Sequence, residues 1–370
     1  MNILNRKTSI KFANLSWLCA LMVVVIHGAT YAANLPGQEL QTVYGMNITT
    51  YFQLFFTEGI CRAAVPLFFV TSGYLYYRNF QATAKWHCDK IFKRLKTNGI
   101  PFLFWGLAVI AFFAIAQAIP ATAQYFASPD RNVMEFSATD WLTKVFIDPL
   151  NSPLWFLRDL LILAVFSPLI TLVCKRLSWL WIAFVAVVWM RWLPIPVYVI
   201  RIESILFFSI GAVLSFHHRG LVEREVAVPG KIAYAVTAAW LIFIAIKTYH
   251  LCALPADVLI NGKPQSVHDL LTRLNSIIAI PSLWIAYDLL PKSAEKKWKL
   301  GQYGFLMFVL HHPVIGVVKK LTLKLLGINM VTVSVAFVFA VVSTCAFVIL
   351  FGYLFKKFLP KLYAIVCGGR

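Results

Sequence analysis

Apolar stretches long enough to cross a lipid bilayer recur along the whole of this chain. Of its 370 residues, 60% are hydrophobic and only 13% are charged, whereas soluble domains are about half apolar and a quarter charged. A helix needs about 20 apolar residues to span the hydrocarbon core. The sequence therefore predicts an all-α, polytopic membrane helix bundle, a single domain over residues 1–370, with about ten transmembrane helices over 12–31, 52–77, 99–120, 152–174, 177–191, 197–216, 231–250, 270–290, 303–318 and 329–355.

Lysines and arginines are unevenly distributed between the two sides of these helices. If the N-terminus is cytoplasmic, and Arg191, Lys231 and Lys247 near helix ends are counted with the adjoining segments, the cytoplasmic segments hold 22 of them and the outer segments hold 8. Cytoplasmic loops carry such an excess, so we expect both termini in the cytoplasm and many crossings of a bacterial inner (cytoplasmic) membrane. Lys319, Lys320 and Lys324, in the last outer loop, break the pattern. The lysines and arginines that set the membrane orientation account for most of the net charge of +19. We therefore expect membrane lipids and no nucleic acid as partners.

Four arginines remain inside the predicted helices: Arg62, Arg158, Arg201 and Arg273. A charge in hydrocarbon is costly unless it faces a partner or a cavity. Glu58 and Arg62 are four residues apart and could form a helical ion pair, and Arg158 and Arg273 could extend to the outer interface. In the predicted topology all four arginines lie at similar depth, near the outer ends of their helices. As a set they predict a polar chamber that would bind an anion or stabilise the oxyanion that develops during a reaction. Glu203 could orient one of them.

His27 is the residue best placed for chemistry, because it follows the apolar run WLCALMVVVI. A neutral imidazole can accept a proton from a hydroxyl group near pH 7. The alternative is a histidine that simply lies at the outer interface. His311 and His312 point in different directions on a helix, so at most one of them faces a given cavity. The 7 cysteines have no metal-binding spacing, and no metal is expected.

Five segments carry more specific patterns: NLSWLCALMVVVIH (14–27), RAAVPLFFVTSGYLYY (62–77), KRLKTNGIPFLFW (93–105), SPLWFLRDLLIL (152–163) and YGFLMFVLHHPVI (303–315). In this order they resemble the integral-membrane acyltransferases of acyltransferase family 3. The similarity is greatest to the type that O-acetylates enterobacterial common antigen. The resemblance implies that His27 is catalytic and that His311, Arg62, Trp155 and Phe156 belong to family motifs.

The resemblance also implies a reaction. An acyl group, usually acetyl, would pass from cytoplasmic acyl-CoA to a hydroxyl group of an envelope glycan or lipid-linked saccharide on the outer face. Acetyl-CoA would be the donor. We expect Lys93, Arg94 and Lys96 at the inner mouth to bind the CoA phosphates. Arg62, Arg158 or Arg201 would stabilise the oxyanion, with His27 as base or as the acyl carrier.

One position departs from the family pattern. The family has an arginine eleven residues before the histidine, which places both groups on one helix face; here that position is Ser16. An altered donor or acceptor, compensation by another basic residue, or lost activity would each account for it. Two other functions stay open: a transporter or flippase for an anionic lipid-linked sugar, and an inactive assembly partner in an envelope complex. Transporters often have repeated halves, and the sequence has no such repeat.

Overall fold

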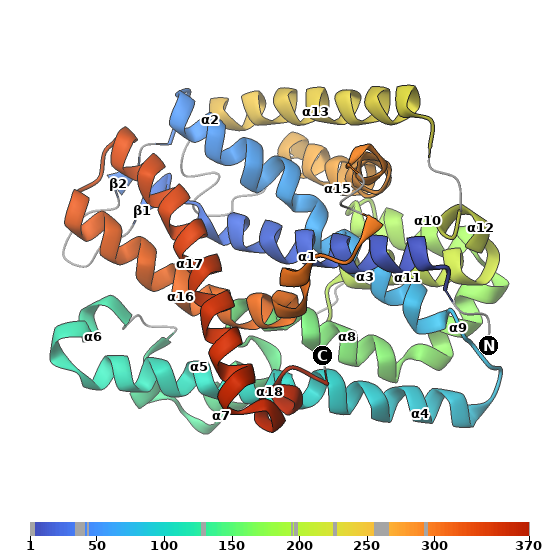
Figure 1. The fold of residues 1–370 in the computed structure, drawn as a ribbon, viewed down its shortest axis with the longest axis horizontal. Coiled ribbons are helices and arrows are strands. Elements are labelled where there is room, and N and C mark those ends of the chain that lie inside the picture. Colours follow the sequence, from blue (N-terminus) through green and yellow to red (C-terminus); the bar gives the residue numbers. More distant parts are fainter. Residues whose placement is uncertain are drawn as a thin grey trace.

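The computed structural model describes residues 4–33, 41–42, 44–126, 131–193, 195, 199–224, 228–254, 266–291 and 295–369. Within them the protein is a bundle of helices (Figure 1). Two strands of two residues each, β1 (Ala32–Ala33) and β2 (Gln41–Thr42), pair antiparallel. The α-helices are α1 Arg6–Gly28, α2 Ile48–Leu54, α3 Ala64–Tyr77, α4 Ala84–Arg94, α5 Ile100–Ala118, α6 Pro120–Phe126, α7 Ala138–Leu142, α8 Trp155–Val165, α9 Ser167–Arg176, α10 Trp179–Trp189, α11 Ile202–His217, α12 Arg219–Val222, α13 Gly230–Ala253, α15 Ser266–Ala286, α16 Gly304–Leu326, α17 Met330–Phe358 and α18 Pro360–Val366.

The predicted membrane helix bundle is confirmed, and each of the ten predicted stretches contains helix. Among the described residues, 7 helical segments are long and apolar enough to cross a membrane. An eighth crossing is made if α8 and α9, which meet at 72°, count as one broken span. The stretches 177–191 and 197–216 correspond to the shorter apolar helices α10 and α11. The number of crossings and the side on which the termini lie stay predictions.

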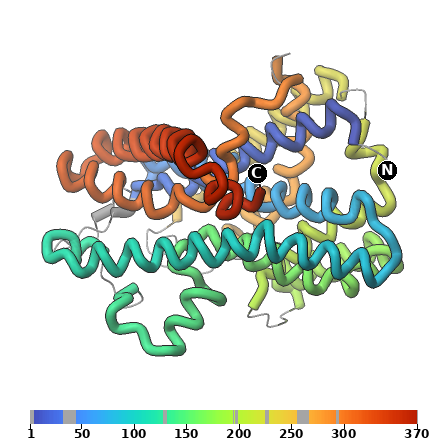
Figure 2. Tube along the Cα trace, turned by 60° about the horizontal axis from the view of Figure 1, so that its bottom comes forward, coloured from blue at the N-terminus to red at the C-terminus, as the bar shows by residue number. Residues whose placement is uncertain are grey.

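The third predicted span begins earlier in the structure than in the sequence pattern. The helical segment starts at Ala84 rather than near residue 99 and continues to Ala118. A π-helical turn, Leu95–Gly99, joins α4 to α5. Figure 2 shows the two helices as one long rod across the molecule. Helix α4 is polar and therefore gives no apolar run in the sequence, yet it packs beside α8, and its buried Trp86 contacts Tyr76 and Tyr77 of α3.

Helices α3 and α11 cross closely enough to exclude side chains at the crossing. A Cβ atom added at Gly73 would lie 2.1 Å from the carbonyl oxygen of Phe208, and one added at Gly211 would lie 2.1 Å from that of Val70. Small residues allow such close backbone approach between membrane helices. Phe69, Tyr77 and other fully buried aromatic side chains complete this centre. The crossing fixes α3 and α11 relative to each other, and both helices line the site described next.

Candidate active site

A cavity of about 190 Å³ lies between the segments that carry three of the four predicted arginines. Arg62, Arg201 and Arg273 line it together with Glu203 and Asp269. Ile26, the neighbour of His27, forms another part of its wall. We call this space the arginine cavity. Three cations from distant parts of the chain therefore face one polar space, as the sequence predicted for the set; Arg158 is not among the lining residues.

Arg62 is held by Glu58 across an irregular stretch of helix. Between α2 and α3 the chain forms a π-helical turn (Phe55–Gly59) and then a 3₁₀ turn (Ile60–Ala63). The guanidinium group of Arg62 donates two hydrogen bonds to Glu58, from Nε at 2.8 Å and from Nη2 at 2.6 Å. The predicted Glu58–Arg62 pair is thus confirmed. Since 42% of the Arg62 side chain stays accessible, the pair fixes the guanidinium group without removing it from the cavity.

Two buried side chains from other helices hold the irregular turn itself. Lys247 of α13 donates from Nζ to the backbone carbonyl of Glu58 at 2.6 Å. Asn275 of α15 donates from Nδ2 to the carbonyl of Gly59 at 2.8 Å. Both side chains are fully buried, so they satisfy carbonyl groups that leave the regular helical ladder. Neither residue was predicted from sequence, although a lysine and an asparagine inside apolar stretches were the available signal.

Asp159 organises the opposite wall of the cavity. Its buried carboxylate accepts hydrogen bonds from the Arg158 guanidinium group at 2.9 and 2.7 Å, from the Ser204 hydroxyl at 2.6 Å and from the Arg201 amide at 3.2 Å. Arg158 also donates to the Ile147 carbonyl and is thereby turned away from the cavity. Arg201 instead lies over the Trp155 ring, 3.8 Å from its centroid, a favourable cation–π contact.

Glu203 and Arg273 complete the charged lining. Within the described residues Glu203 makes no direct hydrogen bond or ion pair, so Glu58 and Asp159 supply the orienting contacts to the arginines. The Glu203 carboxylate interacts with Arg62, Arg201 and Arg273 at longer range. Arg273 donates to the Trp189 carbonyl and lies 5.2 Å from the centroid of the Trp189 ring.

His27 lies in a cluster of three imidazole rings. Its ring centroid is 5.2 Å from that of His311 and 5.1 Å from that of His312. His311 is fully buried, and its Nδ1 lies 2.8 Å from the Met307 carbonyl. Because a carbonyl group can only accept, Nδ1 carries the proton and Nε2 of the neutral ring is an acceptor. That Nε2 atom has no hydrogen-bond partner within the described residues, so His311 places an unused proton acceptor in the cluster.

The three outer lysines that break the charge pattern have local roles. Lys319 donates to the carbonyls of His27 at 2.7 Å and Ala29 at 3.1 Å, at the C-terminal end of α1. Cations are favourable at that end of a helix. Lys320 donates to the Tyr125 carbonyl, and Lys324 lies 4.7 Å from the centroid of the Tyr125 ring. These contacts explain why lysines occur on the predicted outer side.

Ser16 and Lys11 do not supply the cation that the family pattern places near His27. The Ser16 hydroxyl donates to the carbonyl of Phe12 in its own helix at 2.7 Å. Lys11 pairs with Asp288 at 2.8 Å, far along α1 from His27. Lys319 is the basic residue in contact with the His27 backbone.

The predicted phosphate-binding residues lie where α4 meets α5. Lys93 and Lys96 are exposed, whereas Arg94 is half-buried and its guanidinium carbon lies 5.7 Å from the centroid of the Tyr76 ring. None of the three lines the arginine cavity. Their binding of a phosphate group stays a prediction.

Comparison with known proteins agrees with the class of protein that the fold and the site define. The family model described as an acyltransferase domain (acyltransferase family 3) matches residues 14–353. The chain therefore belongs to this family of membrane acyltransferases. It is also similar to the succinoglycan biosynthesis protein ExoH of Rhizobium meliloti (strain 1021), at 28% identity over 287 residues, which cover 74% of this chain and 70% of that protein. No solved structure matches the chain significantly.

Proposed function

We propose that this protein is a membrane O-acyltransferase that moves an acyl group, in the first instance acetyl, from acyl-CoA to a hydroxyl group of an envelope polysaccharide or its lipid-linked precursor. Membership of the acyltransferase family supports the reaction type. The name of the relative, a succinoglycan biosynthesis protein, supports a polysaccharide acceptor. The observation that carries the proposal is a cavity lined by Arg62, Arg201 and Arg273, whose wall also includes Ile26, the residue next to His27 in α1.

The proposed roles follow from the chemistry of these groups. His27 takes the proton of the acceptor hydroxyl as its oxygen attacks the thioester carbonyl carbon. Negative charge then develops on the carbonyl oxygen, and Arg62 and Arg201 stabilise it. When the carbon–sulfur bond breaks, the proton passes from His27 to the departing CoA thiolate. The products are the O-acyl ester and free CoA.

The proposed orientation places the donor in the cytoplasm and the acceptor on the outer face of the inner membrane. The 22 to 8 distribution of lysines and arginines supports it. The contacts of Lys319, Lys320 and Lys324 with backbone carbonyls and aromatic rings give these three lysines a structural role on the proposed outer side. Arg158, which faces Asp159 rather than the cavity, has a supporting role in this scheme.

Radiolabelled acetyl-CoA added to inverted membrane vesicles tests the proposal. We expect label in the polysaccharide or lipid-linked saccharide fraction, released by mild alkali as an O-ester is, together with an equal amount of free CoA. A transporter or an inactive partner would release no CoA above vesicles that lack the protein, and that result would contradict the proposal.

A further inference from the structure

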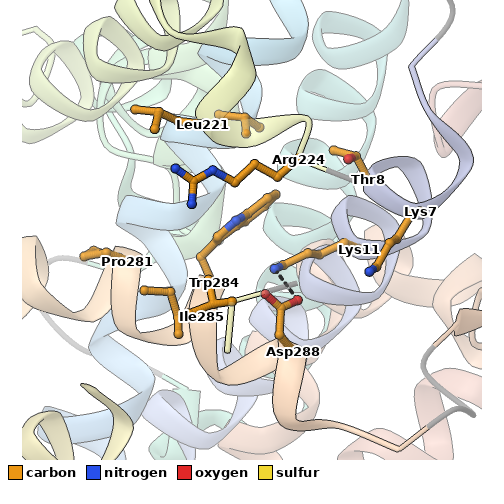
Figure 3. Close-up of a pocket in the computed structure, with 11 residues that line it drawn as sticks. Lys7, Thr8, Lys11, Leu221, Arg224, Pro281, Trp284, Ile285 and Asp288 are labelled. Atoms are coloured by element: carbon orange, nitrogen blue, oxygen red, sulfur yellow. Dashed lines mark hydrogen bonds and ion pairs between the residues drawn. The ribbon is translucent and has the colours of Figure 1, made fainter. Parts of the chain in front are cut away.

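A second cavity lies at the other end of the bundle, near the start of α1. It has a volume of about 290 Å³ and is lined by Lys7, Lys11, Arg224, Trp284 and Asp288 among others. Figure 3 shows these side chains around the Trp284 ring. Lys11 is paired with Asp288 at 2.8 Å, and Arg224 makes no hydrogen bond or ion pair within the described residues. Among its described lining residues, three cations stand against one carboxylate. This space, which we call the basic pocket, is therefore suited to phosphate groups.

The wall of the basic pocket is preorganised. Arg78 donates to the Glu223 carboxylate from Nε at 2.8 Å and from Nη2 at 3.0 Å. Asn5, the residue that caps α1, donates to the backbone carbonyl of Glu223 at 3.0 Å. These contacts fix the segment that carries Arg224 against α1 and α3, so the pocket is not an accidental gap between surface loops.

A third cavity joins this end of the bundle to its middle. It has a volume of about 370 Å³ and shares Leu221, Val222, Pro281 and Trp284 with the basic pocket. Its other walls are almost wholly apolar and come from α1, α3, α11 and α15, with residues such as Val70, Ile210 and Ile280. We call it the apolar groove.

One face of α15 passes all three cavities in turn. Arg273 and Ser276 line the arginine cavity, Ile277 and Ile280 line the apolar groove, and Trp284 lines the basic pocket. Steps of three and four residues keep positions on one helix face. Helices α3 and α11 pass the cavities in the same order. Val65 of α3 and Glu203 of α11 line the arginine cavity, and Val70 and Ile210, further along the same helices, line the apolar groove.

The spacing fits the acyl donor. Trp284 and Arg273 are eleven residues apart, about 16 Å along the helix axis. The arm of CoA between its phosphates and its sulfur has about 13 bonds and extends about 15 Å, at the length per bond of an extended backbone. Phosphates in the basic pocket would therefore bring the thioester to the arginine cavity.

We propose that acyl-CoA binds with its phosphates at Lys7, Lys11 and Arg224 and that its pantetheine arm follows the apolar groove to the arginine cavity. This inference rests on the proposed use of acyl-CoA. It replaces Lys93, Arg94 and Lys96 as the phosphate site, because these residues line none of the three cavities.

Calorimetric titration of the detergent-purified full chain tests the phosphate site. A Lys7→Gln/Arg224→Gln double variant should raise the Kd for CoA at least about tenfold, since hydrogen bonds to charged groups are strong. A matched Arg176→Gln/Lys231→Gln variant, which removes two exposed cations elsewhere, and Arg94→Gln should leave the Kd unchanged. Loss of CoA binding in Arg94→Gln, with binding retained in the Lys7/Arg224 variant, would overturn this inference alone. Absence of CoA binding to the unmodified protein would overturn the proposed function as well.

An Ile280→Trp variant tests the groove. Filling the groove should weaken the binding of CoA but leave the binding of its nucleotide head group, phospho-ADP, unchanged. Retained head-group binding shows that the variant is folded. Equal binding of CoA by the variant and the unmodified protein would place the pantetheine arm elsewhere and overturn the proposed path.

Discussion

Replacing Lys247 with methionine should reduce catalysis through the position of Arg62. The Lys247 ammonium group is fully buried and donates to the Glu58 carbonyl at 2.6 Å, and Glu58 in turn clamps Arg62. A hydrogen bond from a charged donor contributes about 1.5–3 kcal/mol. Methionine has a similar shape, so little cavity cost is added. If the lost contact is expressed wholly at the developing oxyanion, kcat should fall about 10- to 150-fold.

The assay compares acetyl transfer from radiolabelled acetyl-CoA with thermal unfolding of the same preparation. KM for acetyl-CoA should change little, because the contact lies far from the basic pocket. Lys144→Met is the matched control: Lys144 forms a surface pair with Asp148, which is 72% exposed, and such pairs contribute little. A lower melting temperature for Lys247→Met with unchanged kcat would refute the positioning role of Lys247.

Three further predictions concern the packing of α3 against α11, the contact of Lys319 with the C-terminal end of α1, and the ion pair beside the basic pocket. Gly73→Ala should reduce the free energy of unfolding by about 1–3 kcal/mol or more and so lower the melting temperature, because the added Cβ would lie 2.1 Å from the Phe208 carbonyl oxygen. Gly220→Ala, with open space around it, is the control and should leave the melting temperature unchanged. Equal melting temperatures for the two variants would contradict the close crossing of α3 and α11. Lys319→Met should slow acetyl transfer without changing CoA binding, whereas Lys324→Met should leave the transfer rate unchanged. Equal transfer rates for the two variants would show that the contact of Lys319 with the end of α1 has no role in catalysis. Hydrogen bonds from Arg78 lower the pKa of Glu223 below its ordinary value of 4.5. The stability that this contact gives is therefore complete above that value and is lost as the pH falls through the lowered pKa. The melting-temperature difference between the unmodified protein and Glu223→Gln should be full at neutral pH and shrink in acid, and a difference that does not depend on pH would argue against the ion pair.

The membrane bundle and the gathering of polar groups could be predicted from the sequence because each has a local signal. Apolar runs mark the helices, and an arginine in such a run must face a partner or a polar cavity, because its charge is costly in hydrocarbon. That reasoning predicts that Arg62, Arg201 and Arg273 share one polar space, and they line one cavity, whose wall also includes Ile26, the residue before His27. It also gave the Glu58–Arg62 pair, whose partners are four residues apart.

The rest depends on contacts between distant segments, which no local pattern reveals. Arg158 looks like Arg201 in sequence, yet the buried Asp159 carboxylate turns its guanidinium group away from the cavity. Lys247 and Asn275 acquire their roles only because the turn at Glu58 and Gly59 packs against α13 and α15. The basic pocket draws on α1, the segment after α11 and the end of α15, and its cations look in sequence like ordinary cytoplasmic charges.

The His27→Ala variant is the decisive test of whether His27 performs acyl transfer at the arginine cavity. CoA binding and acetyl transfer are measured on the same purified sample, with His218→Ala, at the far end of α11, as the control. We expect His27→Ala to bind CoA as the unmodified protein does but to transfer acetyl at least about 100-fold more slowly, the size of a general-base contribution. Transfer at an undiminished rate would contradict the assignment of His27.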